Sequence, residues 1–88
     1  MEKTRVGVIG CGNISDIYLT NLPRFAALSV VACADLDPAR AAAKAAQYGV
    51  AALSVAALLS DPAIDVVVNL TVPAAHAEVS QAALAAGK

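Results

Sequence analysis

The chain has 88 residues, 59% of them hydrophobic, and a formal net charge of −1. This length fits one small globular domain, and a low net charge without a Lys/Arg cluster argues against nucleic acid or a membrane surface as a partner. The same lack of charge favours a small-molecule partner. The longest charge-free run, residues 45–60, falls short of the ~18 apolar residues of a membrane span, so we expect no transmembrane segment.

The two cysteines, Cys11 and Cys33, lie far apart in the sequence. Their spacing matches neither a Cys-x-x-Cys pair nor a zinc-binding pattern, so reduced thiols in a cytoplasmic protein are the simplest interpretation. We expect no metal site and no catalytic cysteine.

Short apolar runs alternate with alanine-rich segments along the chain. The first run, Thr4–Ile9, is predicted to be a strand, and residues 13–22 a helix that Pro23 ends. Helical spacing predicts that the apolar face of this helix comprises Ile14, Ile17, Tyr18 and Leu22.

The second apolar run, Leu28–Ala34, fits a strand that is covered on both faces. Asp37-Pro38 then provides a cap and a first residue for a helix that Gly49 ends. The alanines expected to pack inward from this helix are Ala39, Ala42, Ala43 and Ala46. Arg40 and Lys44 share its outward face, where a solvated position is the simplest interpretation of both cations.

Two further apolar segments, Val50–Leu53 and Asp65–Leu70, are predicted to be strands. Ser54 caps a short helix that ends near residues 60–62, and a last helix is expected over Ala74–Ala86, before Gly87. Four strands that alternate with four helices predict an α/β fold. We expect a Rossmann-like parallel sheet of strand order 3-2-1-4 with helices on both faces.

The sequence Gly10-Cys-Gly-Asn-Ile-Ser15 lies between the first strand and the first helix. It fits the pattern G-x-G-x-x-[G/A/S], in which the first glycine allows a tight turn and the second lets a pyrophosphate approach the backbone. Ser15 takes the place of the third glycine, and the unpaired amides at the start of the helix favour phosphate. The candidate cofactor-binding residues here are Gly10, Cys11, Gly12, Asn13 and Ile14.

Asp35 follows the second strand, about 20 residues after the glycines, where an acidic side chain accepts hydrogen bonds from the adenosine ribose of NAD. Its carboxylate would repel the 2′-phosphate of NADP, so NAD is the expected cofactor and NADP the less favoured one. The alternative is that Asp35 only opens a turn together with Asp37. Leu36 and Arg40 complete the candidate cofactor-binding residues at this position.

The chain resembles the Gfo/Idh/MocA oxidoreductases over its whole length. The resemblance rests on five segments, Val6-Gly-Val-Ile-Gly-Cys-Gly-Asn-Ile-Ser15, Ala34-Asp-Leu-Asp-Pro-Ala-Arg40, Asp65-Val-Val-Val-Asn-Leu-Thr-Val-Pro73, His76-Ala-Glu-Val79 and Ala85-Ala-Gly-Lys88. It implies that Leu70, Thr71, Pro73 and His76 line the pocket near the nicotinamide. By itself, His76 also fits an ordinary histidine in the first turn of a helix.

The resemblance further implies an enzyme that transfers a hydride between a nicotinamide cofactor and a sugar, cyclitol or related hydroxylated substrate. In that family a strand ending in Glu-Lys-Pro and a substrate-binding α+β domain follow. We therefore expect residues 1–88 to be the NAD(P)-binding part, incomplete for catalysis, with Lys88 in the position before that strand and not itself the catalytic lysine. Two alternatives remain. One is a stand-alone dinucleotide-binding or redox-sensing module. The other is a fragment of an S-adenosylmethionine-binding methyltransferase, which the glycine motif favours less because S-adenosylmethionine contains no pyrophosphate.

In the expected strand order, the strand Asp65–Leu70 has a neighbour on one side only. Residues 66–70 are apolar except for Asn69 and contain neither proline nor lysine. An apolar edge without protective charge favours pairing with another chain, so the sequence predicts self-association through these residues.

Overall fold

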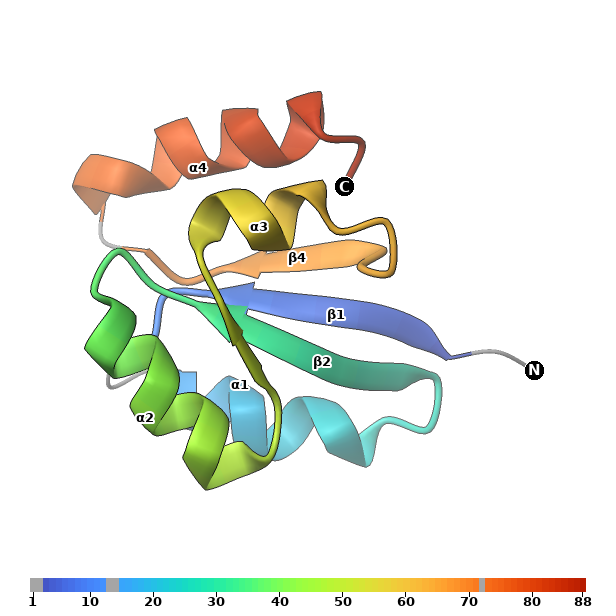
Figure 1. The fold of residues 1–88 in the computed structure, drawn as a ribbon. Helices are drawn as coiled ribbons and strands as arrows, with labels where there is room; N and C mark the ends of the chain where they lie inside the picture. The colour runs from blue at the N-terminus through green and yellow to red at the C-terminus, as the bar shows by residue number, and fades with distance from the viewer. Residues whose placement is uncertain (1–2, 13–14, 72) are drawn as a thin grey trace.

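Four parallel strands form one sheet, and a helix follows each strand along the chain (Figure 1). The computed structural model describes residues 3–12, 15–71 and 73–88. The elements are β1 (Thr4–Ile9), α1 (Ser15–Asn21), the 3₁₀ turn η1 (Leu22–Arg24), β2 (Leu28–Ala34), α2 (Pro38–Tyr48), β3 (Ala51–Leu53), α3 (Val55–Ser60), β4 (Val66–Asn69) and α4 (Pro73–Ala85).

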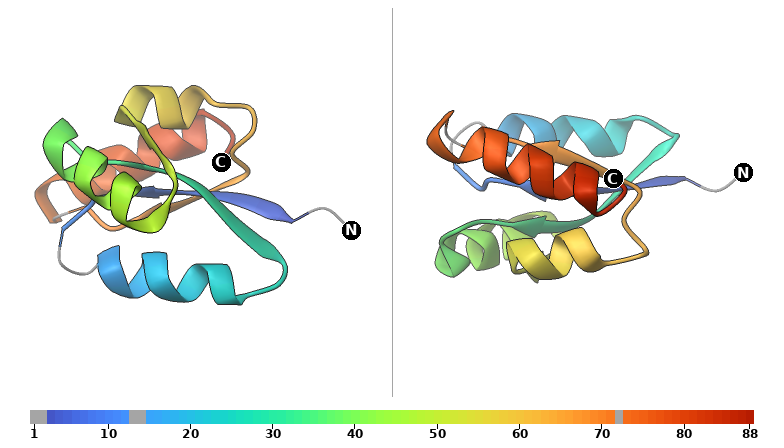
Figure 2. Two further views of the ribbon diagram at one scale, coloured as in Figure 1. Left: turned by 60° about the horizontal axis from the view of Figure 1, so that its bottom comes forward. Right: turned by 90° about the horizontal axis from the view of Figure 1, so that it is seen from above.

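The strand order is β3-β2-β1-β4, which confirms the predicted Rossmann-like sheet. All three strand pairs are parallel. Helices α1 and α2 lie on one side of the sheet, and α3 and α4 lie on the other (Figures 1 and 2). Because the strands are parallel, the segments that leave their carboxyl ends gather at one edge of the sheet, where open α/β sheets bind ligands.

Each face of the sheet has its own apolar core. On one face, Val8 and Cys33 of the strands contact Leu19 of α1 and Ala41 and Ala45 of α2. The core on the other face comprises Ile9, Ala32, Ala34, Leu58, Ile64 and Val79. The buried side chains are mostly small, so the helices pack close to the sheet and their caps sit close to the strand ends.

The predicted strand bounds and helix caps agree with the structure. β1 and β2 have the predicted bounds, while β4 is one residue shorter at each end and α4 begins and ends one residue earlier. Asp37 caps α2 by accepting a hydrogen bond from the Ala39 N–H at 3.0 Å, and Gly49 ends this helix at a φ of 68°. Ser54 caps α3 by accepting from the Ala57 N–H at 3.0 Å.

The predicted buried face of the first helix is only partly right, because Leu22 packs against the core as predicted but two other members of that face do not. Ile17 and Tyr18 are 60% and 37% exposed, whereas Leu19 is buried. Ser15, in the first turn of α1, is also buried. Leu19 lies four residues later, on the same side of the helix, and therefore also faces the sheet. Residues 13–14, where this helix was predicted to begin, lie outside the described residues.

Two further details differ from the sequence prediction. α1 ends at Asn21, one residue before its predicted end, and Pro23 lies in the 3₁₀ turn η1 that follows, near its start, where a residue needs no N–H hydrogen bond. In α2, Ala41 and Ala45 are buried. The alanines that were predicted to pack inward are exposed, namely Ala39, Ala42, Ala43 and Ala46. Alanine occurs all round this helix, so its composition leaves the buried side undetermined.

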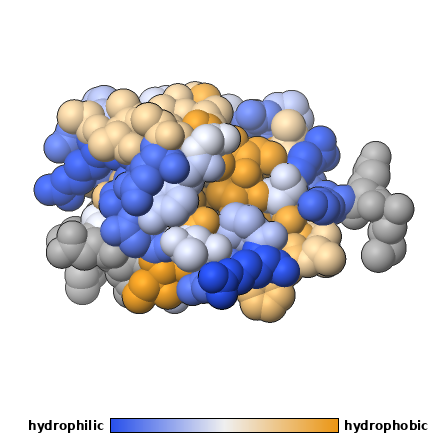
Figure 3. All heavy atoms as spheres, turned by 90° about the horizontal axis from the view of Figure 1, so that it is seen from below, coloured by the Kyte–Doolittle hydropathy of each residue, from blue (hydrophilic) through white to orange (hydrophobic). Residues whose placement is uncertain are grey.

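The α1 and α2 side of the molecule has a mixed surface, with hydrophilic residues beside hydrophobic ones (Figure 3). Among the described residues, the helices lack the length and hydropathy that crossing a lipid bilayer would require.

Candidate functional site

Gly10 makes the turn out of β1, and the fold requires a glycine at this position. Its φ is 103°, and an added Cβ would lie 2.7 Å from the carbonyl carbon of Leu70. The Gly10 N–H donates to the Ala34 carbonyl at 2.8 Å, so the turn passes between the ends of β2 and β4. Gly10 therefore serves close backbone packing and positions the residues that follow.

Gly12 is different, because nothing in the described fold demands a glycine there. Its φ is not positive, and an added Cβ would meet no heavy atom of the described residues within 4 Å. The residue is exposed, so its bare backbone faces open space at the carboxyl edge of the sheet. A ligand that must approach the main chain closely is a physical reason to have no side chain at this position.

Ser15 occupies the third small position of the glycine motif and is completely buried. Its hydroxyl donates to the Gly12 carbonyl at 2.6 Å, and its N–H donates to the same oxygen at 3.0 Å. A larger side chain would separate α1 from the sheet. Serine is small enough for close packing, and its own hydrogen bond holds the end of the glycine turn.

The Asp35 carboxylate joins the glycine turn to the segment after β2. Its Oδ1 accepts a hydrogen bond from the Cys11 N–H and its Oδ2 accepts one from the Asp37 N–H, each at 2.9 Å. The turn role that the sequence left open is thus present. A carboxylate has about four acceptor positions, so two backbone donors leave capacity for ligand hydroxyls.

A small cavity of about 120 Å³ lies between these segments. The residues that line it come from the ends of β1, β2 and β4 and the starts of α2 and α4: Gly10, Gly12, Asp35, Leu36, Arg40, Leu70, Thr71 and Ala75. Seven of these were candidates from the sequence, and only Ala75 was not. The fold therefore brings together residues that are up to 65 positions apart, from Gly10 to Ala75.

The remaining candidates have other environments. Cys11 is 3% exposed and presents its backbone to the turn, while its Sγ lies 3.4 Å from the Ala34 carbonyl oxygen. His76 is exposed, and it is not one of the residues that line the cavity described above. The predictions for Asn13 and Ile14 concern residues outside the described ranges, and Pro73 is described only as the first residue of α4.

Asn69, which sequence reasoning missed, holds the loop between β4 and α4. Its Oδ1 accepts from the N–H and the hydroxyl of Thr71, at 3.1 and 2.6 Å. Its Nδ2 donates to the His76 carbonyl at 3.0 Å and to the Ser80 hydroxyl at 2.9 Å. The signal for it was a single polar residue at the end of an apolar strand. Asn69 places Thr71 at the cavity and ties the loop to α4.

A second missed group connects α1 with α2. Asp16 Oδ1 accepts hydrogen bonds from Lys44 Nζ at 2.6 Å and from the Tyr48 hydroxyl at 2.7 Å. These bonds lower the pKa of Asp16, and the bond to Asp16 raises the pKa of Lys44. Lys44 is therefore charged and paired, with 20% of its side chain exposed, rather than a solvated cation as the sequence suggested.

Both cysteines are free thiols in the core beside the site. Burial raises the pKa of Cys11 to about 12 and also raises the pKa of Cys33. Thiols with raised pKa values stay protonated near neutral pH and react slowly as nucleophiles. Their contribution here is to packing.

Comparison with known proteins agrees with this geometry. Residues 4–88 match the Gfo/Idh/MocA family, described as an oxidoreductase family with an NAD-binding Rossmann fold. A comparison with curated proteins finds no match.

Three solved structures illustrate the similarity. A 3-ketoreductase from Actinomadura kijaniata, solved with NADP and TDP-benzene, is 32% identical over 99% of this chain and 27% of its own, with a TM-score of 0.91. An NAD-binding protein from Listeria innocua is 30% identical over 99% of this chain and 26% of its own, with a TM-score of 0.90. A UDP-N-acetylglucosamine 3-dehydrogenase from Acidithiobacillus ferrooxidans is 31% identical over 99% of this chain and 28% of its own, with a TM-score of 0.85. The chain thus spans between a quarter and a third of the length of these proteins.

The contrast between the two glycines predicts different effects on stability. Gly10→Ala combines an unfavourable φ with a clash against Leu70, so it should lower the free energy of unfolding by about 2–4 kcal/mol. Gly12→Ala should change it by less than about 1 kcal/mol, because the new Cβ enters open space. Urea denaturation followed by circular dichroism measures both. Equal destabilisation by the two variants would contradict this assignment of roles.

Proposed function

Since the chain belongs to the Gfo/Idh/MocA oxidoreductase family, with its NAD-binding Rossmann fold, we propose that it holds NAD in a hydride-transferring enzyme. The proposed substrate is a sugar, cyclitol or related polyhydroxylated compound. A ketoreductase and a nucleotide-sugar dehydrogenase among the similar structures support this substrate class. The family's NAD-binding description also argues against the methyltransferase alternative.

The observation that carries the proposal is the bare backbone of Gly12 beside the cavity that contains Asp35. The fold needs no glycine at this position, whereas a pyrophosphate needs close access to the main chain. In this proposal Gly12 receives the pyrophosphate, and Asp35 accepts hydrogen bonds from the adenosine ribose. The residues present thus fit a dinucleotide.

The other cavity residues have roles that follow from their places around Asp35 and Gly12. Leu36 and Arg40 lie on the α2 side, next to Asp35, and are proposed to contact the adenosine half. Leu70 and Thr71 lie at the end of β4 and are proposed to contact the nicotinamide half, with Asn69 keeping Thr71 in place. The roles of Asn13, Ile14, Pro73 and His76 stay predictions from the family resemblance.

When bound, the nicotinamide supplies the carbon that gives or accepts hydride. The task of residues 1–88 in this proposal is to bind and orient that cofactor. A proton-transferring lysine and a surface for the substrate, which the family resemblance implies, belong to the whole enzyme and are part of the same proposal. A stand-alone binding module would use the same residues for the cofactor, and substrate turnover by the whole enzyme distinguishes the two.

The test of the proposed function is NADH binding by a Gly12→Val variant. A branched side chain on this backbone should exclude the pyrophosphate and weaken NADH binding by at least about tenfold, while the helical circular dichroism signal is retained. NADH fluorescence titration gives the dissociation constants. Gly49→Ala is a control for loss of stability, because it strains a glycine of positive φ at the end of α2, away from the cavity. Unchanged NADH affinity in folded Gly12→Val would place the ligand elsewhere.

The position of Asp35 predicts a preference for NAD over NADP. Asp35→Ala should narrow this preference, because it removes both the ribose acceptor and the charge that repels a 2′-phosphate. Asp35→Asn is the informative companion, since it loses the charge but keeps an acceptor for the Cys11 N–H. Calorimetric titration of the four oxidised and reduced dinucleotides measures the ratio. Equal affinities for NAD and NADP in the unmodified chain would remove the argument for Asp35.

Strand β4 is also a proposed contact with a second copy of the chain. Within the described sheet it pairs only with β1, and Val66 is 43% exposed. Edge strands of this kind pair readily with other strands. We expect the chain to self-associate through residues 66–70 and Val67→Lys to shift it toward the monomer, as light scattering over a concentration series would measure. A stable monomer at high concentration would rule out this contact.

A further inference from the structure

A second cavity, of about 380 Å³, adjoins the one that contains Asp35. Its lining residues are Cys11, Gly12, Arg40 and Lys44. Gly12 and Arg40 line both cavities, so the two are neighbours at the glycine turn. Arg40 and Lys44 lie four residues apart on α2 and therefore on the same side of that helix. A cavity lined by two cations is the kind of place that binds a phosphate group.

Both cations are already paired, but the two pairs differ in their geometry. Arg40 Nε lies 3.7 Å from an Asp37 oxygen, and both side chains are more than half exposed. Lys44 Nζ lies 2.6 Å from Asp16 Oδ1, and the same oxygen accepts from the Tyr48 hydroxyl. Exposed ion pairs of the first kind contribute little and exchange readily. The pair in which Tyr48 also participates holds the Lys44 ammonium group more firmly, although the Lys44 side chain lines the cavity.

The charges around the two cavities sum to a negative value. Two cations, Arg40 and Lys44, face three carboxylates, those of Asp16, Asp35 and Asp37. A ligand that brings a dianionic phosphate into this region meets no net positive charge. NAD carries an uncharged 2′-hydroxyl in place of that phosphate, so it does not need a positive charge here.

We propose that Asp16 is a positioning residue that sets cofactor specificity through Lys44. By holding the ammonium group, Asp16 denies the 2′-phosphate of NADP a counter-charge, and so it reinforces the preference for NAD. The inference rests on the proposed function, in which the cavity of Asp35 receives the adenosine ribose. Asp16 lies in α1, whereas the other residues proposed to contact the adenosine half, Asp35, Leu36 and Arg40, lie at the end of β2 and in α2.

The test is the ratio of NADPH to NADH dissociation constants in Asp16→Asn. Asparagine has nearly the same shape and can still accept from Tyr48, but it lacks the charge that pairs with Lys44. The variant should bind NADPH about fivefold more tightly and NADH within about twofold of the parent. Adding Lys44→Met to Asp16→Asn should remove the gain for NADPH, because the cation that causes it is gone.

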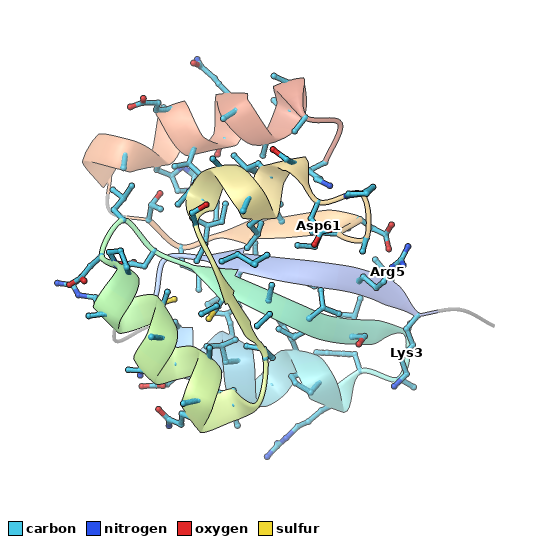
Figure 4. All side chains as sticks on the ribbon, viewed as in Figure 1. Lys3, Arg5 and Asp61 are labelled. Atoms are coloured by element: carbon cyan, nitrogen blue, oxygen red, sulfur yellow. The ribbon has the colours of Figure 1, made fainter. Side chains whose placement is uncertain are left out.

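Asp65→Asn is the matched control. Asp65 also pairs with a cation, Arg5, at 3.4 Å, and the substitution changes the net charge by the same amount. Figure 4 shows Arg5 near the amino end of β1, at the opposite end of the sheet from the cavities. This variant should leave both affinities unchanged, so an equal gain for NADPH would overturn the proposal in favour of a general charge effect.

Other outcomes are equally decisive. An unchanged ratio in Asp16→Asn, an equal loss of both affinities, or a gain that survives Lys44→Met would overturn the inference but not the proposed function, which rests on dinucleotide binding by the parent chain. Failure of the parent chain to bind either dinucleotide would overturn the proposed function and the inference together. Tyr48→Phe, which removes a single hydroxyl, provides an independent variant if Asp16→Asn does not fold. It should shift the ratio toward NADPH by about twofold, and a shift toward NADH would contradict the proposal.

Discussion

The Asp35 carboxylate is the interaction on which the site depends. It accepts N–H groups from Cys11 on one side and Asp37 on the other, so one side chain joins the glycine turn to the start of α2. The two segments lie 24 residues apart in the chain at this contact. Without an acceptor here, the Cys11 N–H would lose its partner in a half-buried place, where such a loss is costly, whereas water can replace the carboxylate at the exposed Asp37 N–H. The same carboxylate is the proposed ribose acceptor, so structure and recognition share one group.

The parallel sheet explains why so many candidate residues converge. Each strand delivers its following loop to the same edge, and the 3-2-1-4 order puts the loops after β1, β2 and β4 beside one another. Gly10 makes this possible, because its positive φ and missing side chain let the turn pass against the backbone of Leu70. Asn69 then fixes the β4 loop by four hydrogen bonds. The residues that line the cavity are thus held in place by hydrogen bonds to the backbone, as Asp35 is, or by a neighbouring side chain, as Thr71 is by Asn69.

The second layer of the site is electrostatic. α1 and α2 lie on the same side of the sheet (Figure 2), and the bonds of Asp16 to Lys44 and Tyr48 connect the two helices. Their pairing determines which charges are available to an anionic ligand. The glycine motif gives no information on this point, because the motif concerns backbone access and the pairing concerns side chains on two separate helices.

Sequence reasoning identified the elements because each has a local signal. Apolar runs marked the strands, and Asp37, Ser54 and Gly49 marked helix ends, since a cap bonds to residues two or three positions away. It also predicted that Gly10, Gly12 and Asp35 act together, from their spacing around a strand and a helix, and all three line one cavity. It failed on the buried sides of α1 and α2. An alanine-rich helix offers several nearly equivalent faces, and only docking against the strands selects one.

By itself, then, the sequence determined the α/β class, the order of elements, the capping residues and the position of the glycine turn. The tertiary structure alone decided that Leu19 rather than Ile17 enters the core, that Asn69 holds Thr71, and that Asp16 pairs with Lys44. The reason is the range of the interactions concerned. Caps and turns join neighbours in the chain, whereas Asp16 reaches partners 28 and 32 residues away, which only the packing of α1 beside α2 brings within hydrogen-bond distance.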